Sequence, residues 1–298
     1  MKTILVGGAT GNIGSLLVPQ LLEAPNVLVR ALVRDAAKAK PLADNGAHLY
    51  TGAFDEPKSL NTAMHDADTV VLIAPPGPDC VKQNASLIAA AKRAGVRKIV
   101  RISAIKSAED GRTENTRLHG QCDRLLQESG LTYVILRPNY FMQNIFLFLD
   151  SIVSDKQFAA GMGDGRLAMI DARDVAESAC AAALSDQFDN QIFEISGPAS
   201  ISFHDVADAL SDTTGQQINY IAISPDEVKA ALLGYGFDEW TANLLREYSA
   251  AFGDGWGDLV TGDVELLTGH PPRSIRQFVS EVIGPALSQS GFAFGPPA

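Results

Sequence analysis

The chain has 298 residues, of which 46% are hydrophobic and 20% charged, and its formal net charge is −11. This length accommodates one large α/β domain and a smaller lobe, and the apolar content excludes a disordered chain. The negative charge argues against direct binding of nucleic acid, because it repels a phosphate backbone.

The first predicted element is a short apolar strand, residues 2–6, that breaks into a glycine-rich turn. Gly8, Gly11 and Gly14 are spaced as G-x-x-G-x-x-G, and a helical segment follows in which Pro19 predicts a kink. Glycines there let the backbone approach a pyrophosphate and aim the N–H groups of the next helix at the anion. Because the spacing departs from G-x-G-x-x-G, the strand–turn–helix context carries the prediction of a nucleotide site. A turn without a ligand is the alternative.

The second predicted strand covers residues 27–33, and Arg34 stands at its end, 20 residues after Gly14. An acidic residue there would bind the ribose 2′-hydroxyl of NAD, whereas an arginine suits the 2′-phosphate of NADP. The position therefore favours NADP. Asp35 offers an alternative partner for a hydroxyl, and Lys38 either adds positive charge or only faces water.

Strands and helices then alternate along the chain. Strands are predicted at 48–50, 69–73, 98–103 and 133–136, and helices at 57–63, 81–94 and 114–129. Gly95 and Gly130 follow two of these helices, where a left-handed residue ends a helix. This alternation predicts an α/β fold, a Rossmann-type doubly wound parallel sheet that binds ligands at the carboxyl ends of its strands.

The pattern changes after residue 138. A helix beginning at residues 170–176 and running to Leu184, and a strand at 192–195, return to the sheet pattern. Ser202 predicts a helix N-cap, and Ser224 opens a capping box with proline at the first helical position. We expect residues 1–155 to form the dinucleotide-binding domain, with 171–196 returning to it. Residues 197–298 with 156–170 are expected to form a smaller, mostly helical lobe on the substrate side.

The remaining composition indicates neither a metal centre nor a membrane protein. Cys80, Cys122 and Cys180 are far apart and form no C-x-x-C pair, so we interpret them as buried apolar residues rather than zinc ligands. The most apolar run, residues 145–153, contains Asp150 and is too short to cross a bilayer. A cytoplasmic location is expected, and the oligomeric state stays open, a homodimer included.

Several motifs together resemble the NmrA-like family of atypical short-chain dehydrogenase/reductase relatives. They are the turn 8–14, Arg34, Leu118-His119 with Asp123, the run 136–144 and the closing segment 267–274. The resemblance spans nearly the whole chain and is specific for fold and cofactor. It is not specific for the substrate, because the family includes NADPH-dependent quinone and triphenylmethane-dye reductases as well as regulators of transcription without turnover.

Carried over by position, the resemblance implies a role for each motif. Gly8, Thr10, Gly11, Asn12, Ile13 and Gly14 would hold the pyrophosphate, Arg34 the 2′-phosphate, Ala74 and Pro75 the adenosine side, and Asn139, Tyr140 and Phe141 the nicotinamide. Relatives often carry Gly-Asp after the third strand, but here the residues are Gly52-Ala53, and Phe54 could stack on the adenine instead. Pro75 only ending a strand and Phe141 only filling the core are the alternatives.

The chemistry departs from conventional superfamily members, which protonate a carbonyl with tyrosine assisted by a lysine four residues later. None of the six tyrosines here has that lysine. His119 takes the tyrosine's place in the helix, with Asp123 on the same face, and is either a near-neutral proton donor or a structural residue. Ser103, at a strand tip, either hydrogen-bonds a ligand oxygen or only ends the strand.

The leading hypothesis is an NADPH-dependent oxidoreductase that transfers hydride to a hydrophobic, conjugated acceptor such as a quinone or dye, with His119 and Tyr140 as candidate catalytic residues. Such electron-poor acceptors take hydride without a strong acid. The alternative hypothesis is a non-catalytic regulatory protein that senses NADP(H) and binds a protein partner.

Overall fold

The computed structural model describes residues 1–291, which group into two compact units. The first comprises residues 1–138, 172–195 and 263–270, and the second comprises 139–171, 196–262 and the segment from 271 onward. Each unit thus draws on separated parts of the chain. Among the described residues, no helix combines the length and the apolarity that a bilayer crossing requires.

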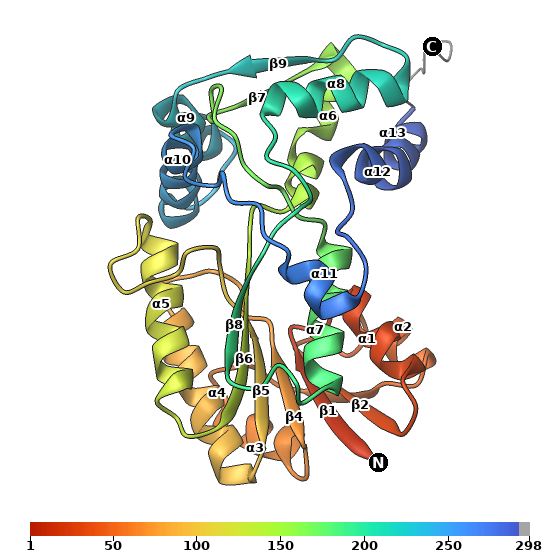
Figure 1. The fold of residues 1–298 in the computed structure, drawn as a ribbon, viewed down its shortest axis with the longest axis vertical. Coiled ribbons are helices and arrows are strands. Elements are labelled where there is room, and N and C mark those ends of the chain that lie inside the picture. The colour runs from red at the N-terminus through yellow and green to blue at the C-terminus, as the bar shows by residue number, and fades with distance from the viewer. Residues whose placement is uncertain (292–298) are drawn as a thin grey trace. The chain divides into compact units, whose positions relative to one another are not determined.

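The first unit is built on a parallel seven-stranded sheet of order β3-β2-β1-β4-β5-β6-β8 (Figure 1). Its strands are β1 (Lys2–Gly7), β2 (Val27–Val33), β3 (His48–Thr51), β4 (Thr69–Leu72), β5 (Lys98–Ile102), β6 (Thr132–Pro138) and β8 (Gln191–Ile195). The order reverses direction between β1 and β4, which is the switch point where such sheets bind ligands. The predicted Rossmann-type α/β fold is confirmed.

Helices cover both faces of this sheet. They are α1 (Gly14–Glu23), α2 (Lys40–Asp44), α3 (Pro57–Met64), α4 (Cys80–Ala94), α5 (Glu114–Gln127), α7 (Ala172–Leu184) and α11 (Asp263–Thr268). Helix α1 packs beside α7, and α4 lies between α3 and α5 on the opposite face. The predicted elements all form, with ends shifted by at most two residues, and α1 continues through Pro19. Gly95 ends α4 in the left-handed conformation, as predicted.

The second unit combines helices with a two-stranded parallel sheet. Its elements are η1 (Met142–Phe148), α6 (Leu149–Asp155), β7 (Gln157–Ala160), α8 (Phe203–Thr214), β9 (Asn219–Ala222), α9 (Pro225–Gly234), α10 (Glu239–Gly253), α12 (Ile275–Phe278), η2 (Val279–Ile283) and α13 (Gly284–Gln289). The predicted caps are present: Ser202 and Ser224 each accept a hydrogen bond from the third residue of α8 and α9. The pair β7 and β9 was not predicted.

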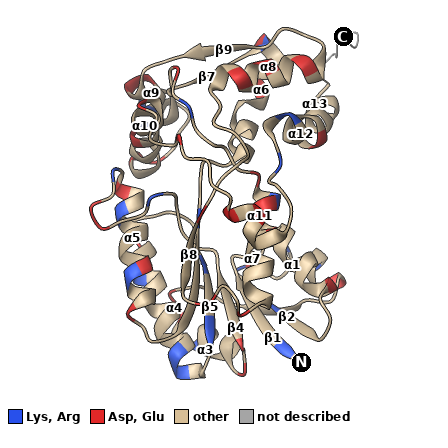
Figure 2. Ribbon diagram, in the orientation of Figure 1, with Lys and Arg blue, Asp and Glu red and all other residues tan. Residues whose placement is uncertain are grey.

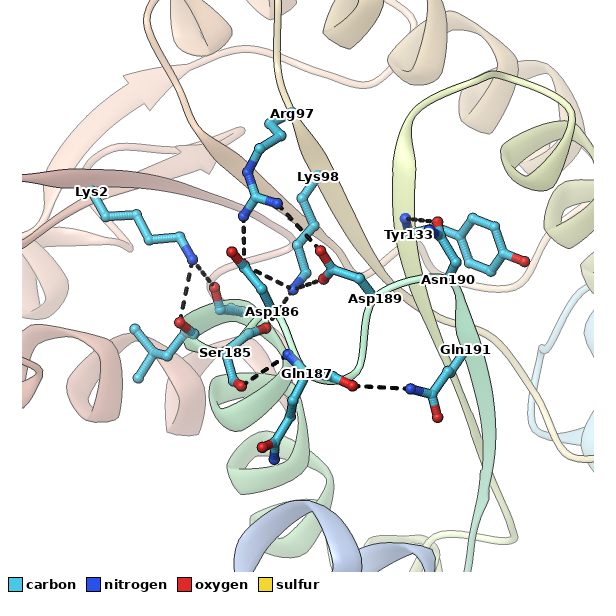
Figure 3. A network of polar contacts seen from close by, with 12 residues as sticks. Lys2, Arg97, Lys98, Tyr133, Ser185, Asp186, Gln187, Asp189, Asn190 and Gln191 are labelled. Carbon is cyan, nitrogen blue, oxygen red and sulfur yellow. Dashed lines mark hydrogen bonds and ion pairs between the residues drawn. The ribbon is translucent and has the colours of Figure 1, made fainter.

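Basic residues begin β1 and β5, at the amino edge of the large sheet (Figure 2). Lys98 is fully buried, and its Nζ donates to the carbonyl of Ser185 at 2.6 Å and pairs with Asp189 at 2.5 Å (Figure 3). Arg97 pairs with Asp186 at 2.7 Å, and Lys2 donates to a carbonyl of α7 at 2.7 Å. We name this set the amino-edge network; it fastens the α7–β8 connection to the sheet.

Candidate active site

The glycine-rich turn lies between β1 and α1, and two of its glycines are required by the protein itself. Gly8 has a φ of +82°, and a Cβ there would lie 2.2 Å from the carbonyl oxygen of Ile73, next to β4. A Cβ on Gly14 would lie 2.3 Å from the carbonyl oxygen of Gly8. These contacts fold the turn tightly against the switch point of the sheet.

Gly11 differs from these two glycines. It is exposed, and the nearest atom to an added Cβ would be 3.5 Å away, an ordinary van der Waals distance. Within the described residues, the amides of Asn12 and Ile13 donate no hydrogen bond, and α1 has neither a side-chain cap nor an acidic residue in its first turn. Free N–H groups at the start of a helix bind anions, so this turn fits the pyrophosphate of a dinucleotide.

Arg34 follows the last residue of β2 and is exposed. It contacts no charged partner among residues 1–291, so its guanidinium is available to a ligand. The carboxylate of Asp35, the alternative partner for a ribose, already accepts from the amides of Ala37 at 2.9 Å and Lys38 at 3.3 Å. Both hydrogen bonds end on one oxygen of Asp35, so the contact of Arg34 with a 2′-phosphate stays a prediction.

Other predicted cofactor residues also lie at the carboxyl edge of the sheet. The ring of Phe54 packs against the end of β1, since a Cβ on Gly7 would be 2.9 Å from it. Ala74 and Pro75 follow β4, the strand that pairs with β1. The structure thus brings Phe54, Ala74 and Pro75 to the edge where the glycine turn lies.

Ser103 opens a buried polar cluster on the α4–α5 face of the sheet. Its hydroxyl donates to Asp123 at 3.0 Å, and Arg137 donates to the same carboxylate oxygen at 2.9 Å and 3.0 Å. Arg101 pairs with the other oxygen of Asp123. We call Asn84, Arg101, Ser103, His119, Asp123, Arg137 and Glu194 the carboxyl-edge cluster.

His119, on α5, is 6% exposed, and its Nδ1 lies 3.0 Å from a terminal nitrogen of Arg101. Because a guanidinium only donates, Nδ1 is the acceptor and the neutral ring carries its proton on Nε2. Burial, and then the charges of Arg101 and Arg137, hold the pKa of His119 well below 6.5. Of the two alternatives for His119, the near-neutral proton donor is therefore contradicted, and the contact that orients the imidazole comes from Arg101.

Asn139, Tyr140 and Phe141 belong to the second unit. The Asn139 amide donates to the carbonyl of Gly257 at 2.9 Å and accepts from the Tyr140 amide at 2.8 Å. The Tyr140 ring lies edge-on to Phe203 and Phe252, and burial raises the pKa of its phenol. These contacts hold the segment in place, while its contact with nicotinamide stays a prediction.

Arg101, Asn84, Arg137 and Glu194 are members of the cluster that sequence reasoning missed. Arg137 pairs with Glu194 at 3.2 Å, and the Lys106 amide donates to Glu194 at 3.0 Å. One signal was available: Arg101 interrupts an apolar strand that a parallel sheet buries on both faces, which implies a buried partner. The cysteines behave nearly as predicted, with Cys80 and Cys122 buried and Cys180 half-buried.

A parallel sheet with free helix amides at its switch point defines a dinucleotide-binding protein of the Rossmann type. The chain belongs to the NAD(P)H-binding family, whose model matches residues 8–187. The predicted binding of a nicotinamide dinucleotide is thereby confirmed.

The proteins that are similar to this chain are consistent with its assignment to this family. An NAD(P)H azoreductase from Xenophilus azovorans is 36% identical over 92% of this chain and 96% of its own. Two solved structures share the fold. The NADPH-dependent quinone oxidoreductase of Escherichia coli is 24% identical, with a TM-score of 0.86 over 94% of this chain and 99% of its own. NmrA, a negative transcriptional regulator, is 17% identical, with a TM-score of 0.79 over 97% and 98%. The fold implied by the resemblance to the NmrA-like family is therefore confirmed.

Proposed function

We propose that the protein is an NADPH-dependent reductase that transfers hydride to a hydrophobic, conjugated acceptor of the quinone or dye type. The observation that carries the proposal is the glycine turn, where the chain itself does not require Gly11 to be glycine and leaves the amides of Asn12 and Ile13 free. A bound pyrophosphate accounts for both features. Thr10, Ile13 and Gly14 complete the turn that would hold it.

The preference for NADPH rests on Arg34. An exposed guanidinium without a protein partner, at the end of β2, matches a 2′-phosphate in charge and in its forked donor geometry. Phe54 would stack near the adenine, and Ala74 and Pro75 would line the adenosine side. The bound nicotinamide would supply the hydride, and the protein would supply binding, orientation and exclusion of water.

The acceptor class is supported by the chemistry and by the relatives. The chain lacks the helical tyrosine–lysine pair that protonates simple carbonyls, and His119 is a neutral ring whose pKa excludes an imidazolium acid near pH 7. Azo compounds and quinones, after which relatives are named, are conjugated and electron-poor. They accept hydride into a delocalised system, for which a hydrogen-bond donor is sufficient.

Within this proposal, the Nε2–H of His119 is the group that hydrogen-bonds the reduced acceptor. The hydroxyl of Ser103 already donates its proton to Asp123, so it does not compete for this role. Asn139, Tyr140 and Phe141 would flank the nicotinamide. Because its pKa is raised, the phenol of Tyr140 keeps its proton and would act as a donor.

A second candidate function is a regulator that binds NADP(H) and a protein partner without turnover. The missing tyrosine–lysine pair and the low pKa of His119 favour it, since both leave the site without a strong acid. The fold is also that of a transcriptional regulator.

One experiment separates the two functions. NADPH absorbance is followed with purified protein and a panel of quinones, azo dyes and triarylmethane dyes, with NADH in parallel and binding of both cofactors measured by calorimetry. Oxidation that depends on the protein, faster with NADPH, supports the reductase. Tight binding of NADPH without oxidation of any acceptor supports the regulator, and absence of binding contradicts both.

A further inference from the structure

Arg101 is a buried cation near the carboxyl end of β5, and each of its three side-chain nitrogens has a hydrogen-bond partner. Its side chain is 1% exposed, and it lies on β5 facing α4 and α5. Its Nε donates to Asn84 at 3.0 Å, one terminal nitrogen pairs with Asp123, and the other lies 3.0 Å from Nδ1 of His119. Burying a guanidinium costs several kcal/mol unless it is paired, so this complete pairing explains how the charge is tolerated.

The partners of Arg101 are themselves fixed. Asp123 also accepts from Ser103 and Arg137, and the amide of Asn84 donates to the carbonyl of Cys80 at 2.8 Å. Because Nε of Arg101 is bound to Asn84 and one terminal nitrogen is bound to Asp123, the guanidinium cannot rotate away from the imidazole. A rigid fork of this kind selects one orientation and one tautomer of the ring.

The opposite nitrogen of His119 is left free. Nε2 has no hydrogen-bond partner among residues 1–291, yet it keeps some accessibility to solvent in a side chain that is 6% exposed. The charges that act on the ring are those of Arg101 on β5 and Arg137 on β6, and the carboxylates of Asp123 and Glu194 pair with these arginines. None of them offers an acceptor to Nε2.

We propose that Arg101 is a positioning residue that holds His119 as a neutral imidazole with its proton on Nε2, so that His119 presents a hydrogen-bond donor to the acceptor. The inference about the acceptor rests on the proposed function, whereas the assignment of the tautomer does not. NADPH, the acceptor and one proton from water give NADP⁺ and the reduced acceptor. His119 donates a hydrogen bond and keeps its proton, because losing it would leave an imidazolate.

The tautomer is tested in the protein without cofactor by two-bond ¹H–¹⁵N correlation spectra of ¹⁵N-histidine protein. His119→Gln identifies the signals of His119, and the exposed rings of His48 and His65 serve as internal references. We expect a protonated Nε2 and an unprotonated Nδ1 from about pH 6 to 8. A proton on Nδ1, or an imidazolium at pH 7, would overturn the proposal whether or not any variant folds.

The role of Arg101 is tested with Arg101→Met against Arg137→Met. Both remove a cation from Asp123, but only Arg101 contacts Nδ1. Arg101→Met should abolish the single tautomer, and Arg137→Met should keep it. A folded Arg101→Met protein that retains the tautomer would refute the positioning role.

Kinetics separates this inference from the proposed function. Loss of one preorganised donor predicts that Arg101→Met and His119→Gln lower kcat roughly 100-fold while the Kd of NADPH changes less than about twofold. Unchanged kcat in both folded variants would overturn the contact with the acceptor. If the tautomer is found but no acceptor is reduced, the proposed function fails and the Arg101–His119 assignment stands.

Discussion

The two edges of the large sheet hold two buried cations of the same strand with different surroundings. Lys98, at the amino edge, bonds only to the α7–β8 connection through Ser185 and Asp189 (Figure 3). Arg101, three residues later and on the other face, bonds to an imidazole whose second nitrogen is free. Burial and charge are alike in the two cases. The two cations therefore differ in what they hold in place. Lys98 holds a connection of the backbone, whereas Arg101 holds a side chain, His119, that still has a free hydrogen-bond donor at the carboxyl edge.

Replacing each cation by methionine tests this comparison most strongly. Lys98→Met and Arg101→Met should each lower the free energy of unfolding by about 1.5–3 kcal/mol, the contribution of hydrogen bonds to a charged group, because Asp189 keeps Arg97 as a partner and Asp123 keeps Arg137. Per folded molecule, only Arg101→Met should lose reductase activity. Chemical denaturation and NADPH oxidation measure the two effects, and a loss of specific activity in Lys98→Met would remove the distinction between the edges.

Charge reversal at exposed positions of the two edges is the next test. Arg34→Glu should weaken NADPH binding about 10- to 100-fold, since a hydrogen bond to a charged group contributes roughly 1.5–3 kcal/mol, and NADH binding should change little. Lys92→Glu, in the last turn of α4 at the amino edge, makes the same change in charge and should alter neither affinity. Calorimetry with both cofactors decides, and equal losses for NADPH and NADH would remove Arg34 from the 2′-phosphate role.

The pH dependence of stability reports on His119. Its pKa is lowered in the native state, so below pH 6.5 the unfolded chain binds a proton that the native state does not. Stability should therefore fall with decreasing pH, at up to about 1.4 kcal/mol per pH unit from this group. Denaturation of the wild type and of His119→Gln between about pH 5 and 7.5 isolates the effect, and parallel curves would contradict it.

The smallest changes in stability and affinity are expected from alanine substitutions of Gly11 and Gly95. Gly11→Ala should leave the free energy of unfolding within about 0.5 kcal/mol, because the added methyl group meets ordinary distances, yet weaken NADPH binding about 10-fold. Gly95→Ala, at the amino edge with a φ of +72°, should cost about 1 kcal/mol of stability and leave binding unchanged. Unaltered affinity in Gly11→Ala would mean that no ligand approaches this turn.

Most of the first unit could be predicted from sequence because its signals are local. Apolar runs, helix periodicity and Gly95 each specify their own segment, and parallel pairing follows from alternation. The pair β7 and β9 could not be predicted in this way. Each strand has four residues, and their partners are 62 positions apart, so pairing depends on tertiary packing that no short window encodes.

In the candidate site, too, the features with a local sequence signal could be predicted and those that depend on distant residues could not. The glycine turn and Arg34 were predicted because strand–turn–helix context and position carry the signal. His119 was found, but its protonation was not, because its pKa depends on burial and then on the charges of Arg101 and Arg137, which reach it from neighbouring strands. Asn139 was expected near the cofactor. Its observed contacts are with the adjacent Tyr140 amide and with Gly257, a partner 118 positions away that the sequence does not reveal.

The first unit is completed late in synthesis. Its final strand, β8, pairs with β6 across more than 50 intervening positions, and α7 and β8 emerge only after residues 139–171 of the other unit. Until then a nascent chain ending at residue 138 holds Lys98 without Ser185, Asp186 or Asp189. The charge would then remain hydrated and the sheet incomplete, so this unit is expected to gain its cooperative stability only after the ribosome has passed the middle of the chain.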